Sequence, residues 1–255
     1  MKISIRALVR PPCPDFVRAL SGHPDAGSID LEKARQQHAD YCQALEQAGV
    51  TVERLEPLND FPDSVFIEDN AVILEGRAVL CSMKEAGRKD EISFLADTLQ
   101  SRVPVIRLQP PVFLDGGDVL QTEDTVFVGL SQRTGQEAVE ALQSLTPKPV
   151  IPVPVKKGLH LKTSVSFLGK NLLVIQPTSV EAGCFKKFEW IEVEEDQAYA
   201  ANCLAVADSV ILPGGFPQLE QRIGQHGFKT LPVPLSEFQK ADGGVTCLSL
   251  LINEV

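Results

Sequence analysis

One pattern recurs five times along the chain: two short apolar runs joined by a polar turn, with polar residues just before the first run. The clearest copies begin at Glu68, Gly116, Leu159 and Ala200, and a shorter copy begins at Gly243. These starts are spaced by roughly 40 to 50 residues, a period typical of repeat architectures. Since short apolar runs bounded by turn residues indicate strands, we expect one structural unit to be used repeatedly.

Segments with the apolar spacing of a helix lie between the strand pairs. Residues 28–49 begin with a cap signal at Ser28 and Asp30 and end at Gly49, a helix breaker. The order of helix, breaker and strand returns in three more segments and, with a weaker helix, in a fourth: 90–108, 135–155, 217–235 and 177–195. A strand at residues 2–9 completes the first unit. The predicted fold is a single α/β domain over residues 1–255, built from about five strand-strand-helix-strand units.

The composition restricts the class of partner. The chain has 34 acidic and 24 basic residues and a net charge of −10, which argues against nucleic acid or an anionic membrane and is compatible with a cationic ligand. Six cysteines form no CxxC pair or zinc-type cluster, so no metal or other cofactor is expected. Because Arg6 and Arg10 interrupt the first apolar run, we expect a cytoplasmic protein with reduced thiols.

If the units stack around an axis, the polar residues before each first strand meet at one end of that axis. That end would collect Asp69, Asp118, His160, Asn202 and Cys247. Cys247 follows a Gly-Gly turn that could expose its thiol, although a cysteine before an apolar run is by itself more often a core residue. The repeat therefore favours a catalytic role that the cysteine alone would not.

The histidines divide into one candidate and three others. His160 lies between two leucines at the start of a strand, where a half-buried histidine bound to a backbone carbonyl is the simpler interpretation. Its place in the repeat favours a function. His23, His38 and His226 are expected to be exposed to solvent.

Carboxylates interrupt two apolar stretches, at Asp63, Glu68, Asp69, Asp115 and Asp118. A carboxylate held against apolar walls is costly unless a cation pairs with it, and a bound cationic ligand would supply that pairing. Ordinary edge turns are the alternative explanation. Arg88 and Arg133 are the nearby basic candidates, and both could equally be surface residues.

Six motifs, in their order along the chain, resemble those of one known family: "FPDSVFIEDNA", "LDGGDVL", "VGLSQRT", "LHLKT", "AANCL" and "DGGVTCLSLLIN". They span nearly the whole chain, and the family is that of the dimethylarginine dimethylaminohydrolases, in the guanidine-modifying, or pentein, superfamily. The resemblance implies a five-bladed pseudosymmetric α/β propeller around a central polar site.

The resemblance also implies roles for individual residues. Cys247 is similar to the family nucleophile and His160 to its general acid and base. Asp115 resembles the acidic residue that accompanies this histidine. Glu68 and Asp69 match the residues that grip the guanidinium group of the substrate.

Five further residues are implied to contact the substrate. Arg88 and Arg133 resemble the pair that binds the carboxylate of the amino acid, and Asp63 resembles the partner of its amino group. Leu20 resembles a loop leucine that closes over the substrate. Ala241 falls where a backbone carbonyl contacts it.

The implied reaction is hydrolysis of dimethylarginine or monomethylarginine to citrulline and an amine, through a thiouronium intermediate on cysteine. A deiminase acting on arginine or agmatine is the nearest alternative. A cysteine peptidase would also use Cys, His and Asp, but it leaves the paired acids unexplained. A ribosome-binding propeller needs no full set of site residues and fits the charge of −10 poorly. The expected partner is a small cationic guanidine, with no nucleic acid or membrane, and a homodimer is compatible with the resemblance.

Overall fold

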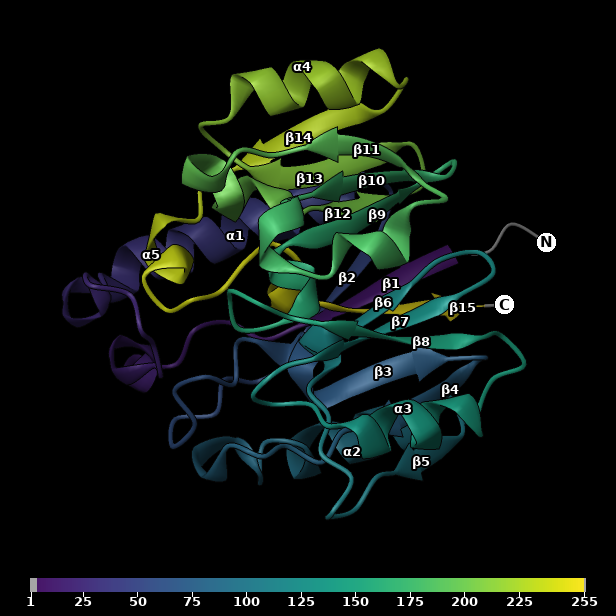
Figure 1. The fold of residues 1–255 in the computed structure, drawn as a ribbon. Helices are drawn as coiled ribbons and strands as arrows, with labels where there is room; N and C mark the ends of the chain where they lie inside the picture. The colour runs from purple at the N-terminus through teal and green to yellow at the C-terminus, as the bar shows by residue number, and fades with distance from the viewer. Residues whose placement is uncertain (1–3, 255) are drawn as a thin grey trace. The chain divides into compact units, whose positions relative to one another are not determined.

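The computed structural model describes residues 4–254, which form five three-stranded sheets (Figure 1). The predicted strand at residues 2–9 is strand β1 from Ser4 onward, and residues 2 and 3 lie outside the described residues. The chain folds as two compact units: the described parts of Met1–Ile67 and Cys203–Val255 form unit 1, and Glu68–Asn202 forms unit 2. The expectation of a single domain over residues 1–255 stays a prediction.

Unit 1 contains two of the sheets. Their orders are β15-β1-β2 and β12-β13-β14. The strands are β1 (Ser4–Val9), β2 (Thr51–Arg54), β12 (Leu204–Val206), β13 (Ser209–Pro213), β14 (Lys229–Val233) and β15 (Leu250–Glu254). The first sheet therefore joins strands from opposite ends of the described chain, with Ser4 opposite Glu254.

Unit 2 contains the other three sheets. Their orders are β3-β4-β5, β6-β7-β8 and β11-β10-β9. The strands are β3 (Ala71–Leu74), β4 (Arg77–Leu80), β5 (Val105–Arg107), β6 (Val119–Gln121), β7 (Val126–Leu130), β8 (Val150–Pro154), β9 (Val165–Gly169), β10 (Leu172–Ile175) and β11 (Glu189–Glu192). Glu75 and Gly76, both with positive φ, join β3 to β4, as a tight two-residue hairpin requires.

All five sheets follow one plan. The middle strand pairs antiparallel with one neighbour and parallel with the other. A parallel pair needs a crossover connection, which a helix usually provides. In four sheets that connection contains α1 (Leu31–Gln47), α2 (Ser93–Gln100), α3 (Gln136–Gln143) or α4 (Pro217–Gln225). All four were predicted from the sequence, whereas the single turn of α5 (Ser236–Gln239) was not.

The remaining crossover, in the sheet β11-β10-β9, has no α-helix. It contains the 3₁₀ turns η7 (Pro177–Ser179) and η8 (Ala182–Phe185), which stand where the sequence predicted a weak helix. Phe185 of η8 is fully buried and packs on Phe127 with ring centroids 4.7 Å apart. This aromatic contact buries apolar surface that a crossover helix would otherwise cover.

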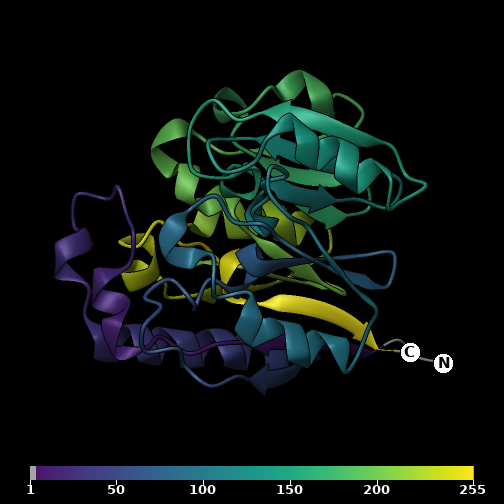
Figure 2. The same ribbon diagram turned by 90° about the horizontal axis from the view of Figure 1, so that it is seen from below.

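Helix α1 shows how the sequence defines an element of unit 1. Asp30 caps the helix by accepting a hydrogen bond from the Lys33 backbone N–H at 3.0 Å. The helix packs against β2 and β14, and Figure 2 shows it, in purple, beside the sheet that carries β15.

The expectation that His38 is exposed was wrong, because His38 shares the buried face of α1 with Ala34 and Tyr41 and is 4% exposed. Burial lowers its pKa to about 4.

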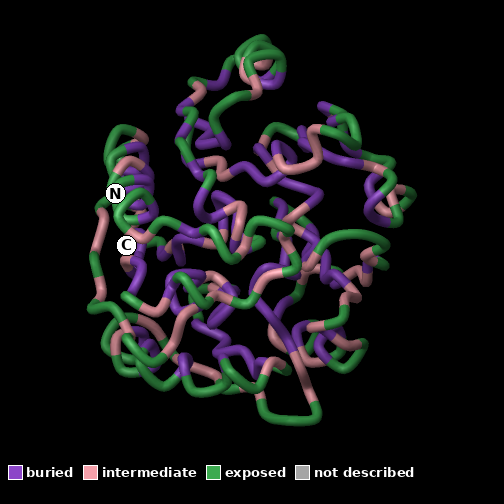
Figure 3. Tube along the Cα trace, turned by 90° about the vertical axis from the view of Figure 1, so that its left-hand side faces the viewer, coloured by how far each residue is buried: buried purple, intermediate pink, exposed green. Residues whose placement is uncertain are grey.

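Buried residues concentrate in the middle strands of the sheets, such as β4, β10 and β13. Figure 3 marks the buried residues along the chain in purple. One apolar cluster of unit 2 combines residues of β3, β4, β6 and β7 with Ala138, Val139 and Leu142 of α3. A second combines β7, β9 and β10 with Phe185 and Phe188. None of the helices within residues 4–254 is both long and apolar enough to cross a membrane.

A 3₁₀ turn precedes the first strand of each repeat and carries its polar residues. These turns are η3 (Ile67–Asn70), η5 (Gly116–Asp118), η6 (Leu161–Thr163), η9 (Glu195–Ala201) and η10 (Thr246–Leu248). Glu68 and Asp69 lie on η3, Asp118 on η5 and Cys247 on η10, while His160 is the N-cap of η6. Within unit 2, η5 lies beside η6 and η6 beside η9, so the predicted convergence of polar residues holds for these turns.

Candidate active site

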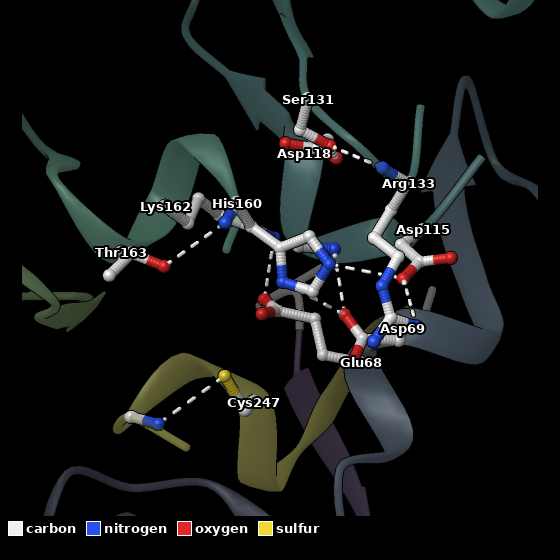
Figure 4. Close-up of polar contacts among 12 residues, drawn as sticks. Glu68, Asp69, Asp115, Asp118, Ser131, Arg133, His160, Lys162, Thr163 and Cys247 are labelled. Atoms are coloured by element: carbon white, nitrogen blue, oxygen red, sulfur yellow. Dashed lines mark hydrogen bonds and ion pairs between the residues drawn. The ribbon is translucent and has the colours of Figure 1, made fainter. Parts of the chain in front are cut away.

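His160 is the centre of a buried group of charged side chains in unit 2 (Figure 4). Its Nε2 donates a hydrogen bond to Asp115 Oδ2 at 3.0 Å, and its Nδ1 lies 3.8 Å from Asp69 Oδ1. Asp115 is fully buried and His160 is 4% exposed. The backbone N–H of His160 also donates to Thr163 Oγ1, which fixes the start of η6. The imidazole is thus held between two carboxylates.

The carboxylates control the protonation of His160. Burial alone would lower its pKa, but the charge of Asp69, the hydrogen bond to Asp115 and the charge of Asp118 raise the pKa to about 9. At neutral pH, His160 therefore carries protons on both ring nitrogens. Burial likewise opposes ionisation of Asp69, but the positive charges of His160 and Arg88 outweigh it and lower the pKa of this carboxyl.

Glu68 is paired with a cation that the sequence did not suggest. Lys162 Nζ donates to Glu68 Oε1 at 2.6 Å, and the two side chains are 15% and 12% exposed. Asn202 Nδ2 donates a hydrogen bond to the Lys162 carbonyl at 2.8 Å. Lys162 lies on η6, the turn that directly follows His160. A buried carboxylate was expected to need a paired cation, and for Glu68 the chain itself supplies one in Lys162.

Asp69 is paired with a cation of the chain as well, the guanidinium group of Arg88. Its Nη1 donates to Asp69 Oδ2 at 2.7 Å, while Nε and Nη2 donate to the two oxygens of Glu91, each at 3.0 Å. Arg88 is 4% exposed, so the interpretation as a surface arginine was also wrong. Burying an arginine is costly unless its charge is paired, and two carboxylates pair with Arg88 here.

Arg133 lies in the loop between β7 and α3, which a buried carboxylate organises. Ser131 Oγ donates to Asp118 Oδ2 at 2.6 Å and accepts from the backbone N–H groups of Arg133 and Thr134. Asp118 Oδ1 accepts from the Leu161 N–H at 2.9 Å, directly after His160 in the chain. Asp118 thereby ties the His160 turn to the Arg133 loop.

The same group includes three side chains that together could offer ligand atoms to a metal. One atom each from Asp69, Asp115 and His160 lies within 4.8 Å of the others. These side chains already neutralise one another, and Arg88 and Arg133 add positive charge at Asp69 and Asp115. The arrangement therefore suits proton transfer by His160 better than the binding of a metal ion.

Glycine is required at position 117. A Cβ on Gly117 would lie 2.7 Å from His160 Nδ1 and 2.9 Å from Asp69 Oδ1, closer than atoms of this kind approach. The Gly117 N–H also donates to Asp69 Oδ1 at 3.1 Å, which requires close backbone approach.

We expect Gly117→Ala to lower kcat/KM about 100-fold, because the methyl group displaces His160 and Asp69 together. Overpacking of this kind also costs about 1–3 kcal/mol of stability. Steady-state kinetics and thermal melting check both effects. Gly224→Ala, at a position with no atom within 4 Å of the added Cβ, is the control. Normal kinetics in the Gly117 variant would show that His160 does not need its present position.

Four predicted site residues belong to unit 1. Cys247 is half-exposed on η10, and the Gly244 N–H donates to its Sγ at 3.4 Å (Figure 4). Asp63 is 5% exposed and accepts from the Leu20 N–H with both oxygens, at 3.1 and 3.3 Å. Leu20 itself is 46% exposed, whereas Ala241 is 3% exposed. The predicted substrate roles of these residues stay predictions.

Comparison with known proteins identifies the family. A family model described as N,N dimethylarginine dimethylhydrolase, eukaryotic, matches residues 25–250. The dimethylarginine dimethylaminohydrolase of Pseudomonas aeruginosa is 34% identical over 249 residues, which cover 95% of this chain and 97% of the relative. The chain belongs to the dimethylarginine dimethylaminohydrolase family.

One further relative and one solved structure also match the chain along most of its length. An uncharacterized protein of Aeropyrum pernix is 38% identical over 241 residues, covering 92% of this chain and 89% of its own. A solved structure of the Pseudomonas aeruginosa dimethylarginine dimethylaminohydrolase, a cysteine-to-serine variant complexed with citrulline, superimposes with a TM-score of 0.93. It covers 100% of both chains at 31% identity, which confirms the predicted five-bladed α/β propeller of this family as the fold class.

Sequence reasoning missed three residues of the buried group around His160: Glu91, Lys162 and Ser131. Glu91 stands three residues after Arg88, and side chains at this spacing meet on a helix. This spacing is the one local signal for the pair of Arg88 and Glu91. Lys162 and Glu68 are far apart in the sequence, so nothing local predicts their contact.

Proposed function

We infer that this protein hydrolyses Nω-methylated arginine to citrulline and methylamine or dimethylamine. The observation that carries this inference is the match to the dimethylarginine dimethylaminohydrolase of Pseudomonas aeruginosa along nearly the whole length of both chains. The structure of that enzyme with citrulline supports the same product. The net charge of −10 and the buried carboxylates of unit 2 suit a cationic substrate.

A guanidinium group resists attack because its positive charge is delocalised and its leaving group is an amine. We propose that Glu68 and Asp69 accept hydrogen bonds from the guanidinium N–H groups, in the planar manner that guanidinium favours. The Cys247 thiolate then attacks the central carbon and forms a carbon–sulfur bond. The bond from that carbon to the methylated nitrogen breaks, and the amine leaves with a proton from His160.

The proton donor on His160 is its Nδ1. Nε2 donates to Asp115, so Nδ1 is the ring nitrogen available to the leaving amine. In the second half of the reaction, neutral His160 takes a proton from water as the water oxygen attacks the thiouronium carbon. The carbon–sulfur bond then breaks, which releases citrulline and returns the Cys247 thiolate, while the second proton of the water passes to solvent, where it protonates the departed amine. Asp115 orients the ring and stabilises its positive charge.

Parallel incubation with four guanidines tests the proposed function. The purified protein is given dimethylarginine, monomethylarginine, arginine and agmatine, and citrulline or its decarboxylated analogue is measured together with the released amine. We expect citrulline with dimethylamine or methylamine from the methylated substrates. Faster release of ammonia from arginine or agmatine would instead assign a deiminase.

Arg133 is proposed to bind the carboxylate of the substrate. Its Nη1 is buried and has no hydrogen-bond partner among residues 4–254, with Asp115 and Glu85 oxygens at 4.0 and 3.8 Å. A ligand carboxylate would satisfy this donor.

We expect Arg133→Ala to raise KM for dimethylarginine about 10- to 100-fold, because it removes a charge-assisted contact with the carboxylate. The decarboxylated analogue, dimethylagmatine, should be affected little, since it has no carboxylate to lose. Initial rates over a concentration series give both values. An equal loss on the two substrates would assign Arg133 a structural role.

The setting of the enzyme is also part of the proposal. We propose that it works in the cytoplasm, because its six cysteines are all thiols and a catalytic cysteine must stay reduced. Its partner is a small guanidine, without nucleic acid or membrane. A homodimer stays a prediction.

A further inference from the structure

The loop of residues 19–28, here called the Leu20 loop, is joined at its end to helix α5 of the same unit. Lys240 Nζ donates to the Ser28 carbonyl at 2.9 Å and to Glu237 Oε2 at 2.7 Å. Glu237 is fully buried, and its Oε2 also accepts from the Asp30 N–H at 2.9 Å. A buried carboxylate that accepts several hydrogen bonds is hard to displace. This end of the loop is therefore fixed.

The tip of the Leu20 loop, residues 21–27, is attached differently. Leu20, directly before the tip, is held by the buried Asp63. The Gly22 N–H donates to Asp242 Oδ2 at 2.6 Å, and among the described residues this hydrogen bond joins the tip to the rest of the chain. Gly22 and Asp242 are both exposed to solvent. Because water can replace either partner, this contact opens more readily than the buried ones.

Asp242 has an unusual backbone conformation, with a φ of 54°. A side chain makes this left-handed region unfavourable, although aspartate adopts it more readily than most residues. Such conformations persist where the surrounding structure fixes them, and they concentrate at functional sites. Two residues later, the Gly244 N–H donates to Cys247 Sγ. One short turn therefore directs a carboxylate to the Leu20 loop and a backbone donor to the cysteine.

We propose that Asp242 is the positioning residue of the Leu20 loop, and that its carboxylate holds the tip beside the turn that leads to Cys247. Release of the Gly22 N–H lets the tip move away and a substrate enter or leave. The proposal rests on the proposed function and on the predicted role of Leu20 at the substrate. In it, Asp242 acts on retention of the substrate and takes no part in the bond-breaking steps.

Asp242→Gly isolates the contribution of the carboxylate. Glycine adopts positive φ without strain, so the turn keeps its backbone while the acceptor is lost. We expect KM for dimethylarginine to rise about 5- to 10-fold and kcat to change less than about twofold, since the lost contact only retains the substrate. Asp242→Asn keeps an acceptor oxygen and tolerates this backbone, so it should restore most of the affinity. A normal KM in Asp242→Gly would overturn the proposal.

Limited proteolysis reports the position of the loop without any substrate. Chymotrypsin cleaves after leucine, and Leu20 is 46% exposed directly before the tip. Cleavage there requires the neighbouring residues, Gly22 included, to leave their folded positions. We expect cleavage after Leu20 to be about 5-fold faster in Asp242→Gly than in the wild type, as measured by mass spectrometry of the fragments. An unchanged cleavage rate would show that Asp242 does not hold the loop.

Ala207→Gly is the matched control for both measurements. Ala207 is exposed in the same unit and has a φ of 50°, but its methyl group cannot accept a hydrogen bond. This variant changes backbone freedom at a left-handed position without removing a contact, and we expect wild-type KM and wild-type cleavage after Leu20. Thermal melting checks that each variant is folded.

Gly22→Pro tests the same hydrogen bond from the other partner. Proline has no backbone N–H, so this variant should raise KM by a factor similar to that of Asp242→Gly. The double variant should show no further rise, because each change removes the same hydrogen bond. Effects on KM that multiply in the double variant would overturn the proposal. This arm also keeps the test decisive if Asp242→Gly does not fold.

Failure of the proposed function gives a different result. If the wild-type protein turns over arginine in place of dimethylarginine, the proposed function fails, and arginine becomes the substrate for the KM comparison. The proteolysis experiment needs no turnover, so its outcome for Asp242 stands in either case.

Discussion

Replacing Cys247 by serine should reduce citrulline formation on the order of 10⁴-fold or more, the scale seen when a covalent nucleophile is removed. Serine is almost isosteric with cysteine, but its hydroxyl hardly ionises near neutral pH and is a far poorer nucleophile. The Gly244 N–H that donates to Sγ is a backbone group, so it remains for the serine oxygen and the local structure is preserved. A discontinuous assay of citrulline with long incubation measures the residual rate.

Two other cysteines provide controls for this experiment. Cys184 has the same half-exposed character as Cys247, and Cys203 is 3% exposed with a pKa raised by burial. We expect Cys184→Ser and Cys203→Ser to keep most of the activity, with a modest loss of stability for the buried position. Near-normal turnover by Cys247→Ser, with an unchanged melting temperature, would contradict the covalent mechanism.

The second large effect concerns His160. His160→Gln should lower kcat/KM about 10³-fold, because it removes the group that protonates the departing amine. In the wild-type enzyme, the pKa of about 9 means that the proton is present below that pH and is lost above it. We therefore expect kcat/KM to fall about tenfold per pH unit above pH 9, and this limb to be absent from the residual activity of His160→Gln.

A pH series of kcat/KM from pH 6 to 10.5 tests this expectation. His226→Gln is the control, since His226 is a half-exposed residue at the end of α4. A descending limb centred below pH 7 would show that Asp69, Asp115 and Asp118 do not hold the proton on His160. The mechanism would then need a different acid for the leaving amine.

Much of the fold could be predicted because the helices and turns of each repeat are specified by nearby residues. Asp30 starts α1 and Gly49 follows its end, and Glu75 with Gly76 forms a turn between two apolar runs. Such signals act over a few residues, so they can be recognised without knowledge of the tertiary structure. His38 was mispredicted because its polarity was given more weight than its phase on the helix, which places it on the buried face.

The charged pairs of the site could not be predicted in the same way. Lys162 and Glu68 are brought together only by the packing of η6 near η3, and Arg88 reaches Asp69 across a strand pair. A carboxylate in an apolar setting shows that it needs a partner, but it does not show which cation supplies the charge. The motifs suggested which residues would react, whereas the cations that pair with the carboxylates could be identified only from the folded structure.

The division of the chain between the units has a consequence for the order in which the protein is made. Unit 2 is one continuous segment, Glu68–Asn202, so all of its sheets can assemble while the ribosome is still producing the rest. Unit 1 must wait, because β1 pairs with β15 and β15 follows Cys247 in the chain. A nascent chain that stops before Leu250 therefore already contains all of unit 2, with His160 and the carboxylates around it. Cys247, in contrast, still lies in a segment that has not folded. Cys247 therefore takes its place on η10 only after strand β15 has been made and can pair with β1.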